Sequence, residues 1–137
     1  MYIAFVNRVV DSNDFKKLIE EKTEFKVVKD MSKGSKREDI VAFNLSVSIS
    51  ILNEILSDDF SAEELNSDDL FEEYLTLAEE LGTDIEEFMD EDAIFDVRAY
   101  KWDESDNDIK LVIAIAHEEL GEQKLRDVMK RLLTQVE

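Results

Sequence analysis

His117 is the only histidine in the chain, and histidine is the side chain most suited to acid–base and metal chemistry near neutral pH. It does not complete a His-Glu-x-x-His motif, and the sequence has neither a second His nor any Cys for a zinc site. The three glycines, Gly34, Gly82 and Gly121, are isolated, so no glycine-rich loop can hold a phosphate. We therefore expect no catalytic residue, no cofactor and no enzyme activity.

Two groups of carboxylates could bind a divalent cation. Residues Asp103 to Ala114 are similar to a calcium-binding loop, but Asp108 replaces the Gly of the turn and Ala114 replaces the final Glu. Asp96 together with Asp108-x-Lys110 would suit a nuclease-like centre. If the two segments form a hairpin, these aspartates lie about 20 Å apart at roughly 3.3 Å per residue, which is too far for one metal ion. We expect no specific metal site, only weak and nonspecific binding of divalent ions by acid pairs.

Acidic residues in the middle of the chain come in adjacent pairs. Between residues 58 and 92 the pairs are mostly four to seven residues apart, which is about 6–10 Å along a helix. Phosphates of one DNA strand advance about 3.4 Å each, so such carboxylates could match every second or third phosphate. The candidate partner-binding residues are Asp58, Asp59, Glu63, Glu64, Asp68, Asp69, Glu72, Glu73, Glu79, Glu80, Glu86, Glu87, Asp90, Glu91 and Asp92.

The excess charge is concentrated in one segment. The formal net charge is −19, and residues 38–97 contain 20 acidic residues but no Lys or Arg. Helices usually mix the two signs, because opposite charges four residues apart stabilise a helix by about 0.2–0.5 kcal/mol and like charges destabilise it similarly. A segment without such pairs indicates a negative surface kept for binding. The alternative is an ordinary solvated helix face.

Apolar patterns predict the strands that position this segment. Apolar and small polar residues alternate strictly from Val41 to Ile51, which is strand periodicity. Apolar runs predict the other strands, at residues 2–10, 25–29, 93–102 and 109–116. We expect the run at 2–10 in the interior, the run at 109–116 in the centre of a sheet, and a polar hairpin turn at 103–108.

Capping residues and 3.6-residue periodicity predict the helices. Asp11-Ser12 begins a short helix with Phe15, Leu18 and Ile19 on one face. Acidic helices are expected at residues 52–57, 62–66, 68–81 and 84–90, and a C-terminal helix from about Glu122. In the 68–81 helix, one face is apolar and the opposite face is expected to carry Asp68, Asp69, Glu72, Glu73, Glu79 and Glu80. Residues 31–37 are expected to form a loose basic loop.

These elements predict a single domain over residues 1–137. Its class is α+β: a mainly antiparallel sheet of about five strands with flanking helices and an acidic helical insert at about 52–90. Apolar residues make up 44% of the chain, which is enough for a core. No apolar stretch has the length of a transmembrane helix, and the start lacks the features of a signal peptide, so we expect a cytoplasmic protein without membrane contact.

The charge favours a basic protein as partner and disfavours direct binding to nucleic acid, which is itself a polyanion. The first hypothesis is an inhibitor that acts as a DNA mimic. It would block the basic nucleic-acid-binding channel of a host enzyme such as a CRISPR or restriction nuclease, by steric occlusion helped by electrostatic steering. In charge and size the chain resembles phage-encoded DNA mimics, which implies an anti-restriction or anti-CRISPR role.

Two alternatives remain from other classes. An immunity protein or antitoxin would use the same charge to cover the active site of a basic nuclease toxin. A phage or bacterial accessory protein would need its acidity only for solubility. A homodimer is a further arrangement, in which a basic stretch contacts the acidic face of a second copy; its residues are Lys26, Lys29, Lys33, Lys36 and Arg37.

Overall fold

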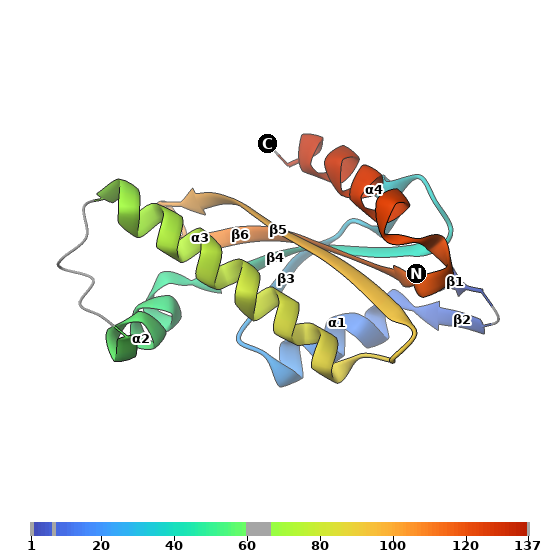
Figure 1. Cartoon of the computed structure of the whole chain (residues 1–137), viewed down its shortest axis with the longest axis horizontal. Helices are drawn as coiled ribbons and strands as arrows, with labels where there is room; N and C mark the ends of the chain where they lie inside the picture. Colours follow the sequence, from blue (N-terminus) through green and yellow to red (C-terminus); the bar gives the residue numbers. More distant parts are fainter. Residues whose placement is uncertain (1, 7, 60–66, 137) are drawn as a thin grey trace.

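The computed structural model describes residues 2–6, 8–59 and 67–136. The fold is mixed α+β, with helices on both faces of a four-stranded antiparallel sheet (Figure 1). The order of its strands is β3 (Lys26–Asp30), β4 (Ile40–Ser48), β6 (Asp108–His117) and β5 (Ala93–Asp103). Two short strands, β1 (Tyr2–Phe5) and β2 (Arg8–Asp11), form a separate hairpin. No helix among the described residues is long and apolar enough to cross a membrane.

The prediction that the apolar run at 109–116 is central is confirmed. Strand β6 pairs with β4 from Ile40↔Ala116 to Ser48↔Asp108, and with β5 from Ala93↔His117 to Asp103↔Asp108. Residues 111–116 are buried throughout because both faces of this strand are covered. The strands predicted at 25–29, 93–102 and 109–116 therefore match β3, β5 and β6 within one or two residues at each end.

Each face of the sheet has its own core. On one face Phe43, Leu45, Leu111 and Ile113 pack under α1 (Ser12–Lys22), α2 (Ile49–Asp59), α3 (Ser67–Thr83) and the 3₁₀ helix η3 (Asp84–Phe88). On the other, Ala42, Val112 and Ala114 pack under α4 (Glu122–Thr134) and the 3₁₀ helix η1 (Ser32–Ser35). Another 3₁₀ helix, η4 (Glu118–Leu120), leads into α4. The predicted C-terminal helix is confirmed: Leu125, Val128, Met129 and Leu132 are buried.

The single interior strand predicted at 2–10 is wrong. The chain reverses after Phe5, and Val6 adopts a φ of 59°. Ile3 and Phe5 are fully buried in the first core, whereas Tyr2 and Val9 are 77% and 68% exposed. The apolar run therefore belongs to a hairpin with one buried face, which a continuous apolar pattern cannot distinguish from a strand buried on both faces.

The strand predicted over 41–51 ends three residues early. The Ser48 hydroxyl accepts a hydrogen bond from the Ser50 N–H at 3.1 Å, which caps a helix starting at Ile49. Ile49, Leu52 and Leu56 are buried together, so Ile49 satisfies both the strand alternation and the helix spacing. Helix α2 accordingly replaces the end of the predicted strand and the short helix predicted at 52–57.

Two further predictions need correction, and a third falls outside the described residues. The stretch at 31–37 is tightly held: the Ser32 hydroxyl accepts from the Ala42 N–H at 3.0 Å, and Arg131 donates to the Ser35 carbonyl at 2.7 Å. The helix predicted at 84–90 is the shorter 3₁₀ helix η3. The helix predicted at 62–66 lies outside the described residues. Among the described residues, the acidic insert between β4 and β5 thus consists of α2, α3 and η3. Helix α3 extends the helix predicted at 68–81 by one residue at its start and two at its end.

Candidate protein-binding surface

Helix α3 is fixed on the sheet by aromatic contacts. The Tyr74 ring lies perpendicular to the Trp102 ring of β5, with 5.1 Å between the centroids, and its hydroxyl donates to the Asn53 side chain of α2. Phe71 stacks on the same indole, with 6.4 Å between the ring centroids. Ala78 is fully buried one turn further along. This contact face determines which carboxylates of α3 point away from the core.

The outward face of α3 carries fewer carboxylates than predicted. Asp69, Glu72 and Glu80 are exposed, and Glu73 is half-buried. Glu79 does not belong to this face: its Oε1 accepts a hydrogen bond at 3.0 Å from the Ala99 N–H on the outer edge of β5. An acid at a sheet edge satisfies a backbone donor that would otherwise be open to another strand. We assign Glu79 to the scaffold.

The line of carboxylates continues beyond α3. Ile85 is fully buried and anchors η3, so that Asp84, Glu86 and Glu87 on either side of it are exposed. Asp90 and Glu91 follow in the turn that leads into β5. We call the exposed carboxylates of α3, η3 and this turn the acidic surface; its members are Asp69, Glu72, Glu80, Asp84, Glu86, Glu87, Asp90 and Glu91.

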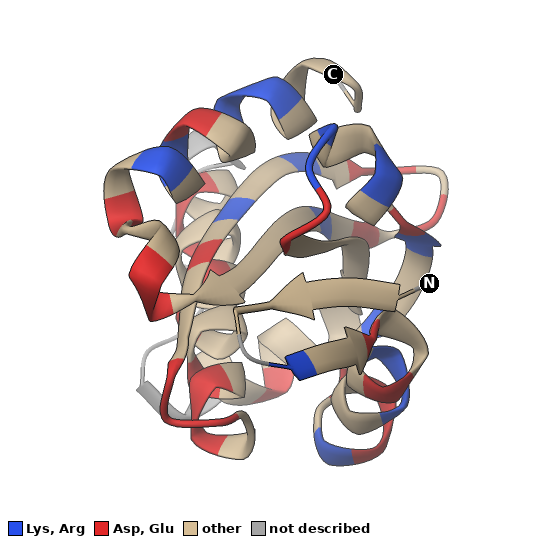
Figure 2. Ribbon diagram, turned by 90° about the vertical axis from the view of Figure 1, so that its right-hand side faces the viewer, with Lys and Arg blue, Asp and Glu red and all other residues tan. Residues whose placement is uncertain are grey.

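Most of this surface has no positive partner. Among the described residues, no Lys or Arg forms an ion pair with the carboxylates of Glu72, Glu80, Asp84, Glu86, Glu87 or Glu91. Figure 2 shows blue and red segments mixed on α4 at the top, whereas the turn of η3 and the loop into β5 at the lower left carry red only. The exposed carboxylates of η3 and of the loop into β5 therefore form one continuous acidic stretch of the described chain.

Other predicted residues are neutralised from outside the acidic segment. Arg8 of β2 donates to both oxygens of Asp92, at 2.9 and 3.0 Å, and to Asp90 at 2.7 Å. His117 Nε2 lies 3.2 Å from Asp92 Oδ2. The hydrogen bonds from Arg8 hold the pKa of the Asp92 carboxyl below its ordinary value. Asp92 thus joins the β1–β2 hairpin to the sheet. The absence of opposite-charge pairs inferred for residues 38–97 therefore holds only for partners within that segment.

The remaining predicted residues lie at the edge of the described chain or outside it. The backbone of Asp58 and Asp59 lies at the end of α2, and that of Asp68 lies in the first turn of α3. Glu63 and Glu64 lie outside the described residues. Asp84 is one member of the acidic surface that the sequence reasoning missed, because the search was for adjacent pairs and Asp84 stands alone.

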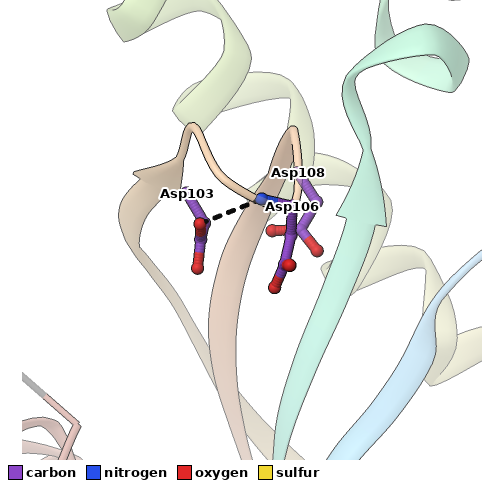
Figure 3. Close-up of side chains that lie close together, drawn as sticks. All are labelled: Asp103, Asp106 and Asp108. Carbon is purple, nitrogen blue, oxygen red and sulfur yellow. Dashed lines mark hydrogen bonds between the residues drawn. The ribbon is translucent and has the colours of Figure 1, made fainter.

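Three aspartates meet at the tip of the β5–β6 hairpin (Figure 3). The carboxylates of Asp103, Asp106 and Asp108 lie within 4.8 Å of one another, and the Asp106 N–H donates to Asp103 at 3.1 Å. The Lys110 ammonium already pairs with two of the three carboxylates, at 3.1 Å from Asp106 and 3.0 Å from Asp108. A twelve-residue calcium loop is excluded because residues 108–117 are an extended strand. We interpret the cluster as the structure of the turn.

The proposed nuclease-like pair is separated as predicted. Asp96 lies opposite Ala114 in the register of β5 and β6, six positions from Asp108 along the strand. Six residues of strand span about 20 Å, so no single ion can contact both carboxylates. Burial raises the pKa of Asp96, whose Oδ2 atom has no hydrogen-bond partner.

An apolar hollow of about 560 Å³ adjoins the acidic surface. Tyr2 and Val9 of the β1–β2 hairpin, Leu18 of α1 and Phe88 of η3 are among the residues that line it. The sequence reasoning missed this site because it placed residues 2–10 in the interior and gave Phe88 no role. Exposed apolar residues on segments far apart in sequence leave no local signal.

Comparisons of the chain with models of protein families, with curated proteins and with solved structures gave no match.

Proposed function

We propose that the chain is an inhibitor that imitates DNA and blocks the basic nucleic-acid-binding channel of another protein, such as a CRISPR or restriction nuclease. The observation that supports this proposal is the acidic surface, in which Glu72, Glu80, Asp84, Glu86 and Glu87 form no ion pair with a Lys or Arg of the described residues. Such a surface costs stability through like-charge repulsion, so its retention favours a binding role.

The geometry of α3 suits this role. From Asp69 to Glu80 the helix advances about 16 Å, which corresponds to about five phosphate steps along one DNA strand. The aromatic contacts of Tyr74 and Phe71 with Trp102 hold the helix in place before binding, so little ordering entropy is lost when a partner docks. The inhibitor would act by occupying the channel, and its long-range field would raise the association rate at low salt.

The test is inhibition of DNA cleavage by purified nucleases, including a guide-loaded CRISPR nuclease and restriction endonucleases. The test variant combines Glu72→Lys, Glu80→Lys, Glu86→Lys and Glu87→Lys. The matched control combines Glu21→Lys, Glu24→Lys, Glu118→Lys and Glu119→Lys, which alters the net charge equally at exposed positions elsewhere. We expect the unaltered protein to inhibit cleavage, and excess DNA to relieve the inhibition. The control variant should still inhibit, and the test variant should not. No inhibition of any nuclease, or an equal loss in both variants, would contradict the proposal.

A second candidate is an immunity protein that covers the active site of a basic nuclease toxin. The apolar hollow favours it, because DNA phosphates present no apolar side chain and a mimic of charge alone would not need Tyr2, Val9 and Phe88 exposed. Addition of excess DNA separates the two candidates. A mimic and DNA compete for one channel, so cleavage should recover if the chain is a mimic. An immunity complex dissociates very slowly and resists such competition.

A further inference from the structure

The apolar hollow is built from three elements that the fold brings together. Val9 comes from the hairpin, Phe15 and Leu18 from α1, and Phe88 and Met89 from the end of η3. Phe15 is buried in the first core, and Met89 packs against that core, so the floor of the hollow is rigid. Its volume of about 560 Å³ is within the range of sites that take a large side chain or a small ligand.

The residues around its mouth are unusually open to water. Tyr2 is 77% exposed, Val9 68% and Phe88 41%. Ile3 and Phe5, on the opposite side of the same hairpin, are fully buried. The contact of the hairpin with the core therefore does not require apolar residues on its outer face. Contiguous exposed apolar side chains with a polar rim are typical of protein-binding sites.

The rim of the hollow is acidic. Asp11 and Asp14 lie on the side of α1, and Asp90 lies on the side of β5. A hydrogen bond from the Asn13 N–H at 3.0 Å caps α1 and lowers the pKa of Asp11, which is therefore ionised at neutral pH. No Lys or Arg lines the hollow in the part of the chain that the structure describes. Arg8 pairs with Asp90 at 2.7 Å and Lys17 acts on Asp11, but neither cation lines the hollow, so a cationic side chain at the mouth would meet more carboxylates than cations.

We infer that this hollow is the anchor of the partner interface, and that it takes an aromatic or long aliphatic side chain flanked by Arg or Lys on the target protein. The inference rests on the proposed function, because it assigns a basic partner. Glu86 and Glu87 of the acidic surface directly precede Phe88 in η3, so one binding segment can contact both. The acidic surface then provides attraction and orientation, and the hollow provides the desolvated contact that gives an interface most of its affinity.

Two synthetic peptides of equal charge test this inference. One has three alternating Arg and Lys residues on each side of a central Trp, and the other has Ser in place of the Trp. Calorimetric titration at low salt should show at least about tenfold tighter binding of the Trp peptide. Val9→Ser and Phe88→Ser should each remove that preference without changing the affinity for the Ser peptide. The control Val28→Ser, at a 52% exposed position on β3, should keep it.

The outcomes separate this inference from the proposed function. Equal affinities for the two peptides, or a Trp preference that survives Val9→Ser, would overturn the hollow as the anchor, and absence of binding by either peptide would overturn it as well. If Glu72→Lys and Glu80→Lys leave the affinity for the Ser peptide unchanged while the Trp preference persists, the hollow stands and the charge-mimic proposal fails. Val9 is largely exposed, so its variant tests the site even if Phe88→Ser unfolds.

Discussion

Replacement of Lys110 by Met tests whether the aspartate cluster at the hairpin tip is a structural turn. The Lys110 side chain is nearly buried, and burial opposes its charge, but hydrogen bonds to Asp108 and Asp106 raise its pKa overall. Methionine keeps the apolar stem and removes the ammonium. It leaves the carboxylates of Asp106 and Asp108 without their shared cation, within 4.8 Å of each other and of Asp103.

The expected loss of unfolding free energy is about 3 kcal/mol. The Asp108 carboxylate is only 13% exposed, and an ionised group left there without its partner costs about 2–3 kcal/mol. Asp106 is 62% exposed, so its pair with Lys110 contributes about 0–1 kcal/mol. Against a total stability of about 5–15 kcal/mol, such a loss is readily measured by urea denaturation followed by circular dichroism.

The matched control is Lys101→Met, at the position paired with Lys110 in the β5–β6 register. Its ammonium is 51% exposed and 3.7 Å from Asp103, so we expect a change within about 0.5 kcal/mol. The Lys110→Met variant should also recover about 1.4 kcal/mol in calcium at about ten times the variant's dissociation constant for calcium, with a smaller gain in the unaltered protein. A loss no larger than that of the control would refute the structural role assigned to Lys110.

Three further predictions concern single side chains. Asp96→Asn should raise stability by about 1 kcal/mol at pH 7, since a buried oxygen of the Asp96 carboxylate has no hydrogen-bond partner. Chemical denaturation should show that this gain shrinks as the pH falls through the raised pKa of Asp96, because the carboxyl of the unaltered protein then becomes protonated. Glu79→Ala should free the Ala99 N–H at the edge of β5, with about 1 kcal/mol lower stability and more self-association in analytical ultracentrifugation. Ser48→Ala should cost about 1 kcal/mol in a urea titration, because it removes the cap that the Ser50 N–H uses; an unchanged midpoint would contradict that role.

Most elements of the scaffold were predictable because local pattern and burial agree. The continuous apolar run of β6 corresponds to a strand covered on both faces, and the apolar positions of α4 from Leu125 to Leu132 correspond to its buried stripe. The errors occur where one pattern fits two structures. Ile49 satisfies the alternation of β4 and the spacing of α2, and only the Ser48 cap decides between them.

The candidate site was predictable only in part, for reasons of distance along the chain. Arg8 is 84 positions from Asp92, and Glu79 is 20 positions from the backbone donor that it covers. Nothing local in the sequence distinguishes these two acids from the exposed Glu72 and Glu80. The hollow depends on the same kind of information, since its walls come from the hairpin, α1 and the end of η3, which are far apart in the sequence.

The acidic residues of the insert therefore serve two opposed purposes. Asp92 and Glu79 are engaged by Arg8 and by a backbone N–H, so they stabilise the scaffold and are unavailable to a partner. Glu72 and Glu80 have no such partner in the described part of the chain, and repulsion between them and neighbouring acids makes the folded chain less stable. Binding strength should accordingly depend on where a charge is removed. The net charge of −19 alone cannot predict it, because part of that charge is already used by the fold.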